Sequence, residues 1–233
     1  MPESREMGVM RAIGQTVLGL ILTAVLWTAS GPAVATDLTV DVRDGDGQPV
    51  PDAVVTLAPR GADAALLAAK APGLVHKLVV DQRNETFIPY VQIVPQGGEV
   101  VFRNSDLTRH HVYSFSPVKA FEFVLAPGEA SDPVTFTRTG VVAVGCNIHD
   151  RMVAYLYISD LPWAALTDQQ GRAVLTGLPD GAYQLHSWHP RLRPGRPEPT
   201  QPVALAGASG QATVALALTR DRRGAPDPER PRY

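Results

Sequence analysis

The sequence of 233 residues is poor in cysteine and in net charge. It contains one cysteine, Cys146, so no disulfide can form within the chain. The formal net charge of -2 at pH 7 offers no basic surface for nucleic acid. The N-terminal region has no pair of adjacent arginines, which favours ordinary secretion in the unfolded state over twin-arginine export. A disulfide-stabilised scaffold and a nucleic-acid-binding protein are therefore excluded.

The first 35 residues have the pattern of an export signal. Arg5 and Arg11 give a positive start, residues 12–29 are largely apolar, and Ala33-Val34-Ala35 is a small-x-small cleavage site. We expect cleavage after the last of these alanines, a periplasmic or secreted mature protein, and no stable membrane span after cleavage. The alternative is an uncleaved anchor, which the short and interrupted apolar run disfavours.

The lone cysteine is followed closely by a histidine and a methionine. Cys146, His149 and Met152 have the spacing Cys-x2-His-x2-Met and offer a thiolate, an imidazole and a thioether, which copper prefers over magnesium or calcium. A free thiolate in an oxidising compartment is open to oxidation, and a metal bond protects it. One alternative is a buried structural cysteine. A second is a catalytic nucleophile, but no protease signature flanks Cys146. A third is a structural zinc ligand, and the methionine argues against a zinc site of that kind.

A blue copper site needs a second histidine from another segment. Residues 102–115 read as a strand, a polar bend and a second strand, and His110 and His111 enter that second strand. Neighbouring side chains of a strand point to opposite faces, so only one of the two faces the site. Asn104, before the bend, is a candidate to hydrogen-bond to the loop near Cys146.

Residues 78–159 resemble the cupredoxins, the family of plastocyanin, amicyanin and azurin. The stretch Val100-Val101-Phe102-Arg103-Asn104 is similar to the strand before the first ligand, and His110-His111-Val112 is similar to the family's His-Asn-Val. The resemblance implies a Greek-key β-sandwich or barrel and one type 1 copper per chain. It also implies four ligands, namely His110, Cys146, His149 and Met152. His111 stands where the family usually has asparagine, so the choice between the two histidines stays open.

A second set of segments predicts another, smaller β-sandwich. Residues 38–43 and 50–57 alternate around the turn Asp44–Pro49 and predict a hairpin. They resemble the opening of the carboxypeptidase regulatory-like sandwich, and residues 167–185 and 212–218 resemble its later strands. We therefore expect one sandwich split by an inserted copper domain, since a lone hairpin cannot bury a core. The alternative is two independent pieces in a row.

The chain is thus expected to be all-β, with many turns formed from its 20 glycines and 21 prolines. Pro95-Gln96-Gly97-Gly98 predicts a hairpin turn, and the proline-rich stretch 190–202 predicts a loop. Residues 61–71 can form one short helix or a connector. His186, Trp188 and His189 are candidates for a second metal or sugar site, although a structural role is favoured. The expected organisation is a signal peptide (1–35), the first sandwich part with a connector (36–73), the cupredoxin domain (74–160), the second sandwich part (161–218) and a disordered tail (219–233).

The resemblance implies one-electron transfer and no enzymatic activity. The expected partners are redox proteins, such as a cytochrome or a dehydrogenase, and the short ligand loop hints at methylamine oxidation. Nucleic acid is not an expected partner. The alternative is a binding module, in which copper is carried for storage or delivery and the split sandwich attaches the protein to a surface.

Overall fold

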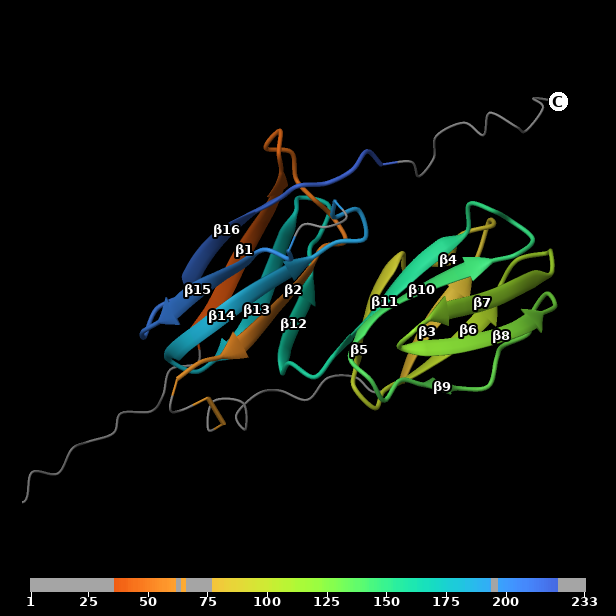
Figure 1. Ribbon diagram of the computed structural model, residues 1–233, viewed down its shortest axis with the longest axis horizontal. Coiled ribbons are helices and arrows are strands. Elements are labelled where there is room, and N and C mark those ends of the chain that lie inside the picture. The colour runs from red at the N-terminus through yellow and green to blue at the C-terminus, as the bar shows by residue number, and fades with distance from the viewer. Residues whose placement is uncertain (1–35, 62–63, 66–76, 194–196, 222–233) are drawn as a thin grey trace, which may run out of the picture. The chain divides into compact units, whose positions relative to one another are not determined.

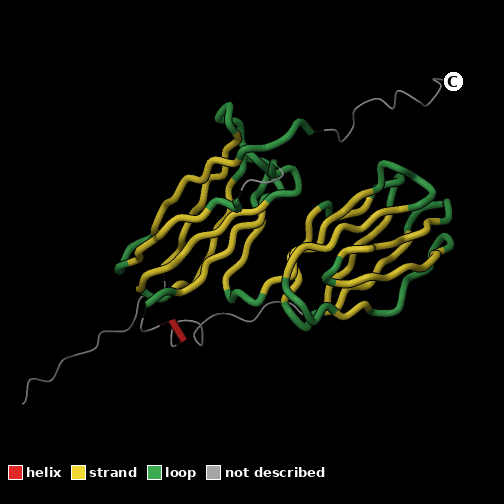
Figure 2. The backbone as a smooth tube through the Cα atoms, in the orientation of Figure 1, coloured by secondary structure: helices red, strands yellow, loops and turns green. Residues whose placement is uncertain are grey.

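The computed structural model describes residues 36–61, 64–65, 77–193 and 197–221. The predicted signal peptide, nearly all of the predicted connector and the predicted tail beyond residue 221 lie outside the described residues. Strands dominate the part that is described (Figure 2), which confirms the all-β prediction. Within the same part, no helix has the length and apolar character needed to cross a membrane.

The described residues form sixteen strands, which are labelled in Figure 1. They are β1 (Thr36–Asp44), β2 (Val54–Pro59), β3 (Lys77–Gln82), β4 (Phe87–Ile88), β5 (Val91–Pro95), β6 (Glu99–Asn104), β7 (His110–Ser116), β8 (Lys119–Leu125), β9 (Val134–Thr135), β10 (Gly140–Cys146), β11 (Val153–Ser159), β12 (Trp163–Leu166), β13 (Arg172–Leu178), β14 (Gly181–Trp188), β15 (Thr200–Leu205) and β16 (Gly210–Leu216). Strand β15 begins at Thr200, inside the proline-rich stretch 190–202, so the loop predicted there ends earlier than expected.

Two sheets are built from the first and last strands of the chain. One has the order β13-β1-β16 and the other has the order β12-β2-β14-β15. Side chains of β1 alternate between buried and more exposed, and Leu38, Val40 and Val42 are fully buried. They share one core with buried residues of the second sheet, including Leu57 and Tyr183. Strands from both ends of the sequence therefore contribute to a single hydrophobic core.

The predicted hairpin between β1 and β2 is confined to its turn, where Arg43 and Pro49 form an isolated antiparallel bridge. The carboxylate Oδ1 of Asp44 accepts hydrogen bonds of 2.9 Å from the backbone amides of Asp46 and Gln48, which forms the turn. Yet β1 pairs with β13 and β16, whereas β2 pairs with β12 and β14. Both strands are central in their own sheets, so the chain crosses between sheets at this turn.

The other two sheets are built from the middle of the chain. Their orders are β5-β11-β10-β7-β8 and β4-β3-β6-β9 (Figure 1). A second hydrophobic core contains fully buried side chains from both sheets, among them Val80, Phe102, Val112 and Leu156. Burying each such side chain contributes about 1.5–3 kcal/mol. The turn at 95–98 is present, but it joins β5 to β6 in different sheets, so the hairpin predicted there is wrong.

Three neighbouring strands bring the predicted ligand segments together. Strand β10 pairs with both β7 and β11, and Cys146 lies opposite Val112 in this register. The start of β7, with His110, therefore lies beside the end of β10. The loop of residues 147–152 connects β10 to its other neighbour, β11, so its two ends are fixed to one sheet.

Candidate metal centre

The loop that carries three of the predicted ligands is closed by backbone hydrogen bonds. The amide of Cys146 donates to the carbonyl of Met152 (3.2 Å), and the amide of Met152 donates to the carbonyl of His149 (3.0 Å). The amide of Asn147 donates to the carbonyl of His111 (3.0 Å), which ties the loop to β7. These backbone hydrogen bonds therefore fix where the side chains of Cys146, His149 and Met152 begin.

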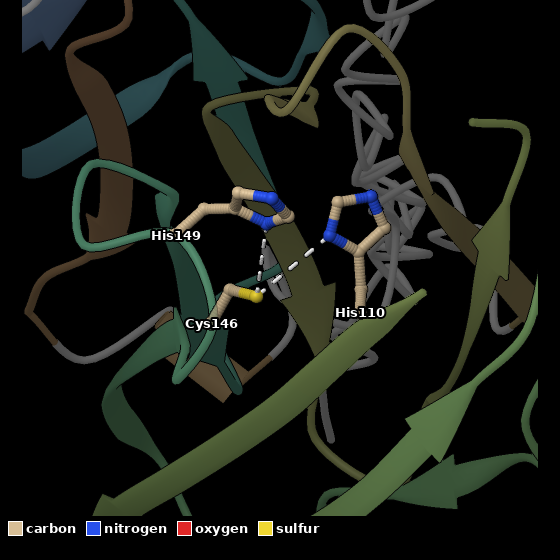
Figure 3. A group of neighbouring side chains, drawn as sticks. All are labelled: His110, Cys146 and His149. Atoms are coloured by element: carbon tan, nitrogen blue, oxygen red, sulfur yellow. Dashed lines mark hydrogen bonds between the residues drawn. The ribbon is translucent and has the colours of Figure 1, made fainter. Parts of the chain in front are cut away.

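Three predicted ligands converge on one point. The sulfur of Cys146 lies 3.7 Å from the Nδ1 atom of His110 and 3.8 Å from the Nδ1 atom of His149 (Figure 3). One ligand atom from each of the three residues lies within 4.8 Å of the others, and the centroids of the two imidazole rings are 4.9 Å apart. His110 is fully buried and Cys146 is 4% exposed, so water is largely excluded from the sulfur.

The separation of these atoms fits a single bound metal ion. For metal–nitrogen and metal–sulfur bonds of about 2.1 Å and 2.3 Å, ligands at tetrahedral to trigonal angles lie about 3.6–3.8 Å apart. The two sulfur–nitrogen distances of 3.7 and 3.8 Å agree with this range. A thiolate with two imidazoles is also a donor set that copper prefers. The residues present therefore fit a copper ion.

A carboxylate fixes the orientation of the first histidine. The Nε2 atom of His110 lies 2.9 Å from the Oδ2 atom of Asp106. An ionised carboxylate only accepts hydrogen bonds, so Nε2 carries the proton and Nδ1 presents its lone pair to the sulfur of Cys146. Pairing of a ligand histidine with a carboxylate is the usual way to set its tautomer in metal sites.

Asp106 is itself held by several hydrogen bonds. Its carboxylate accepts from the backbone amides of Asn84 and Glu85, the latter at 2.9 Å, and its own amide donates to the Oδ1 atom of Asn104 (2.9 Å). Burial acts to raise the pKa of Asp106, but the hydrogen bonds from Glu85, His110 and Asn84 outweigh it and lower the pKa below its usual value. Asp106 therefore stays ionised beside His110.

The structure distinguishes the two adjacent histidines. His110 is fully buried, and His111, on the opposite side of β7, is partly exposed. The Nε2 atom of His111 lies 2.7 Å from a carboxylate oxygen of Glu122 on the neighbouring strand β8. Of the two, only His110 belongs to the cluster with Cys146.

The fourth predicted ligand is buried in the core next to the loop. Met152 is 3% exposed and belongs to the same hydrophobic cluster as Cys146. The predicted bond from Asn104 to the Cys146 loop is wrong. The Nδ2 atom of Asn104 donates to the carbonyls of Thr108 (2.8 Å) and Leu125 (3.0 Å), so it shapes the bend before His110 instead.

Two residues near the cluster were not identified from the sequence. Asp106 precedes His110 by four residues in an irregular bend, where spacing alone does not predict a contact. Glu85 lies in the distant turn after β3, and its carboxylate is 3.6 Å from the Nε2 atom of His149. Only the fold brings these carboxylates to the outer nitrogens of the two histidines.

The second candidate site is not supported. Trp188 is 9% exposed and His189 is 1% exposed, which agrees with the structural role that the sequence favours. The Nδ1 atom of His189 accepts a hydrogen bond from the amide of Arg191 (3.1 Å). Among the described residues, the cluster of His110, Cys146 and His149 is the sole group of this kind suited to a metal ion.

No protein-family profile and no curated protein matches the chain. Among solved structures, it is similar to a purple cupredoxin from Nitrosopumilus maritimus, with 20% identity, a TM-score of 0.32 and coverage of 35% of this chain and 99% of that one. Amicyanin from Paracoccus versutus matches with 20% identity, a TM-score of 0.33 and coverage of 40% and 88%. A copper-containing nitrite reductase from Thermus scotoductus matches with 24% identity, a TM-score of 0.34 and coverage of 43% and 27%. Cupredoxins are thus among the solved structures to which the chain is similar, and the case for a metal rests on the ligand geometry.

Proposed function

We propose that the protein is a one-electron carrier with a single type 1 copper site and no enzymatic activity. One observation carries this proposal, namely the buried convergence of the Cys146 sulfur with the Nδ1 atoms of His110 and His149 at 3.7 and 3.8 Å. A cysteine and two histidines at this spacing match the trigonal plane of a blue copper site. Copper supplies the one-electron change between its two oxidation states when it is bound there.

Each residue has a separate task in this proposal. Cys146 would hold the ion through its thiolate, His110 and His149 would hold it through Nδ1, and Met152 would contribute its thioether. Asp106 holds the ring of His110 in the required tautomer through the 2.9 Å contact. The loop between β10 and β11 is held by backbone bonds at both ends, which limits its rearrangement during electron transfer.

The edge of His149 is the proposed point of electron exchange. Its side chain is 13% exposed, whereas that of His110 is fully buried, so a partner protein can approach His149 more closely. Asp150 and Arg151 follow it in the sequence and are both exposed, which places charge beside this edge. The proposed partners are redox proteins of the cytochrome or dehydrogenase kind, met in the periplasm or outside the cell after removal of residues 1–35.

We also propose the domain organisation expected from the sequence. Residues 36–73 and 161–218 form one sandwich, residues 74–160 form the copper domain inserted into it, and residues 219–233 are a tail. The pairing of β1 with β13 and β16 supports this division, since strands from both flanking segments share one sheet. Insertion at a surface turn is tolerated because the ends of an inserted domain often lie close together.

Copper loading of the mature protein tests the proposed function. We expect Cu(II) to give an intense blue colour that a reductant bleaches and an oxidant restores. Cys146→Ser is the matched control, because it removes the sulfur and keeps a side chain of similar size, and it should stay colourless. Tight, colourless Cu(I) binding with transfer to an acceptor, and no blue Cu(II) form, would instead support storage or delivery and overturn electron transfer.

A further inference from the structure

A tight turn after β3 reaches the candidate metal centre. The backbones of Arg83 and Thr86 exchange two hydrogen bonds, of 2.9 and 3.1 Å, across the two residues between them. Those two residues, Asn84 and Glu85, both have a φ of 53°. Two central residues with positive φ define a type I′ turn, whose usual sequence is Asn-Gly.

Glutamate is an unusual residue at the second central position. Asparagine tolerates the left-handed region at Asn84, but a side chain with a Cβ at Glu85 is disfavoured there, and glycine is the common choice. Disfavoured backbone conformations of this kind cluster at functional sites, where the surrounding structure maintains them. The position therefore calls for a reason to keep the glutamate side chain.

The same carboxylate that orients His110 maintains this turn. Asp106 accepts hydrogen bonds from the backbone amides of both Asn84 and Glu85, and its Oδ2 atom lies 2.9 Å from the Nε2 atom of His110. The turn is thus attached to the first ligand histidine through one side chain. This attachment fixes where the side chain of Glu85 begins.

The side chain of Glu85 is directed to the other histidine. Its Oε1 atom lies 3.6 Å from the Nε2 atom of His149, with the glutamate 43% exposed and the histidine 13% exposed. With Nδ1 of His149 directed to Cys146, Nε2 is the nitrogen that carries the proton and faces outward. Each histidine therefore has a carboxylate at its outer nitrogen, Asp106 in one case and Glu85 in the other.

We infer that Glu85 is a positioning residue that acts through His149 to stabilise the oxidised copper site and so lower its reduction potential. This inference rests on the proposed electron-carrier function. The oxidised site carries one more positive charge than the reduced site, so a fixed negative charge near it favours the oxidised state. The partly exposed carboxylate also adds negative charge at the edge of His149.

The test is the midpoint potential of the copper-loaded protein and its Glu85→Gln variant. Glutamine keeps the size of the side chain and removes its charge, so we expect a higher potential in the variant. The expected change in the ratio of reduced to oxidised protein, at a fixed applied potential, is about three- to tenfold, where tenfold corresponds to 59 mV for one electron. Glu85→Asp, which keeps the charge, should have a potential between the two.

Asn84→Gly is the matched control from the same turn. It changes the residue next to Glu85 and leaves the Glu85 carboxylate in place. Glycine readily adopts the positive φ of this turn, so the reduction potential of the variant should equal that of the wild type. A second readout needs no metal. Glu85→Gly keeps the turn and removes the steric penalty of a Cβ at positive φ, so the metal-free variant should unfold at a higher urea concentration than the wild type.

The outcomes separate this inference from the proposed function. Equal potentials in the wild type and Glu85→Gln, with reversible copper redox chemistry in both, would overturn the inference and leave the electron-carrier function standing. A wild type without a reversible copper couple would overturn both. A higher potential in Glu85→Gln, with Asn84→Gly unchanged, would support the inference.

Discussion

The Oδ2 atom of Asp106 lies 2.9 Å from the Nε2 atom of His110, and the two residues are joined by a short bend before β7. This contact determines which nitrogen of the buried imidazole faces Cys146. Replacing Asp106 by alanine removes that control and leaves a buried N–H without its carboxylate. We expect copper affinity to fall about 10- to 100-fold, as is usual when such an outer partner is lost.

A copper competition titration measures this loss. Leu107→Ala is the control from the same bend, because the Leu107 side chain is 96% exposed and packs against little of the protein. Its copper affinity should match that of the wild type. Equal affinities in Asp106→Ala and Leu107→Ala would contradict the role given to Asp106.

The adjacent histidines of β7 provide a second prediction. His110→Ala removes a ligand whose Nδ1 atom is 3.7 Å from the sulfur, so the blue copper spectrum should be lost. His111→Ala removes a side chain that contacts Glu122 on the outside of the sheet, so the spectrum should persist. Visible absorption of both variants after copper loading measures this, and a blue His110→Ala protein would show that the ligand assignment is wrong.

Asp81 and Arg103 give a pH-dependent contribution to stability. They lie opposite each other on β3 and β6, and the guanidinium contacts both carboxylate oxygens at 3.2 and 3.0 Å. The hydrogen bond from Arg103 lowers the pKa of Asp81 below its usual 3.8, and burial opposes this. Because the folded-state pKa is lowered, the stabilisation is complete above the usual value and is lost as pH falls through the lowered pKa.

Urea unfolding of the wild type and Asp81→Asn across this pH range measures the effect. We expect the wild type to have the larger free energy of unfolding near pH 7, and the difference to shrink below about pH 4. Asp41→Asn is a control at a more exposed pair with Arg172, where the effect at neutral pH should be smaller. A difference for Asp81→Asn that does not depend on pH would refute the electrostatic explanation.

Substitution of two glycines with positive φ should lower the free energy of unfolding by different amounts. At Gly171 (φ +73°), an added Cβ would lie 2.5 Å from the carbonyl oxygen of Val42 and 2.8 Å from the amide nitrogen of Val50. At Gly177 (φ +70°), an added Cβ would meet no atom within 4 Å. Gly177→Ala should therefore lose about 1–2 kcal/mol from backbone strain alone.

Gly171→Ala adds a backbone clash to the same strain, so its loss should be larger, about 3–5 kcal/mol. Urea denaturation of both variants measures the two costs. Equal losses would show that the contact between the turn at Gly171 and its neighbours Val42 and Val50 is less tight than the structure indicates.

The sequence predicted the clustering of His110, Cys146 and His149 better than the strand pairing. Cys146 and His149 are close in sequence, so their spacing carries the information, and alternation along one strand separates His110 from His111. The turns at 44–49 and 95–98 were also predicted correctly. A turn shows where the chain reverses, but not whether the next strand pairs with the previous one or crosses to another sheet. Neither predicted hairpin therefore extends into paired strands.

The contacts of Asp106 and Glu85 with the two histidines could not be predicted from the sequence, for a different physical reason. Asp106 is close to His110 in sequence, but its contact depends on an irregular bend that Asn104 shapes through bonds to Thr108 and Leu125. Glu85 reaches His149 only because β3 and β10 are assembled around one core. Such contacts follow from tertiary packing, which no local pattern encodes.

X-ray absorption at the copper edge of the loaded wild-type protein tests the central claim most directly. We predict a first coordination shell with one sulfur and two imidazole nitrogens, at distances within about 0.2 Å of the 2.3 Å and 2.0–2.1 Å that these donors have in zinc sites. The sulfur contribution at this distance should disappear in Cys146→Ser. A first shell of nitrogen and oxygen only, in the wild type, would contradict the assignment of this cluster as a copper–thiolate centre.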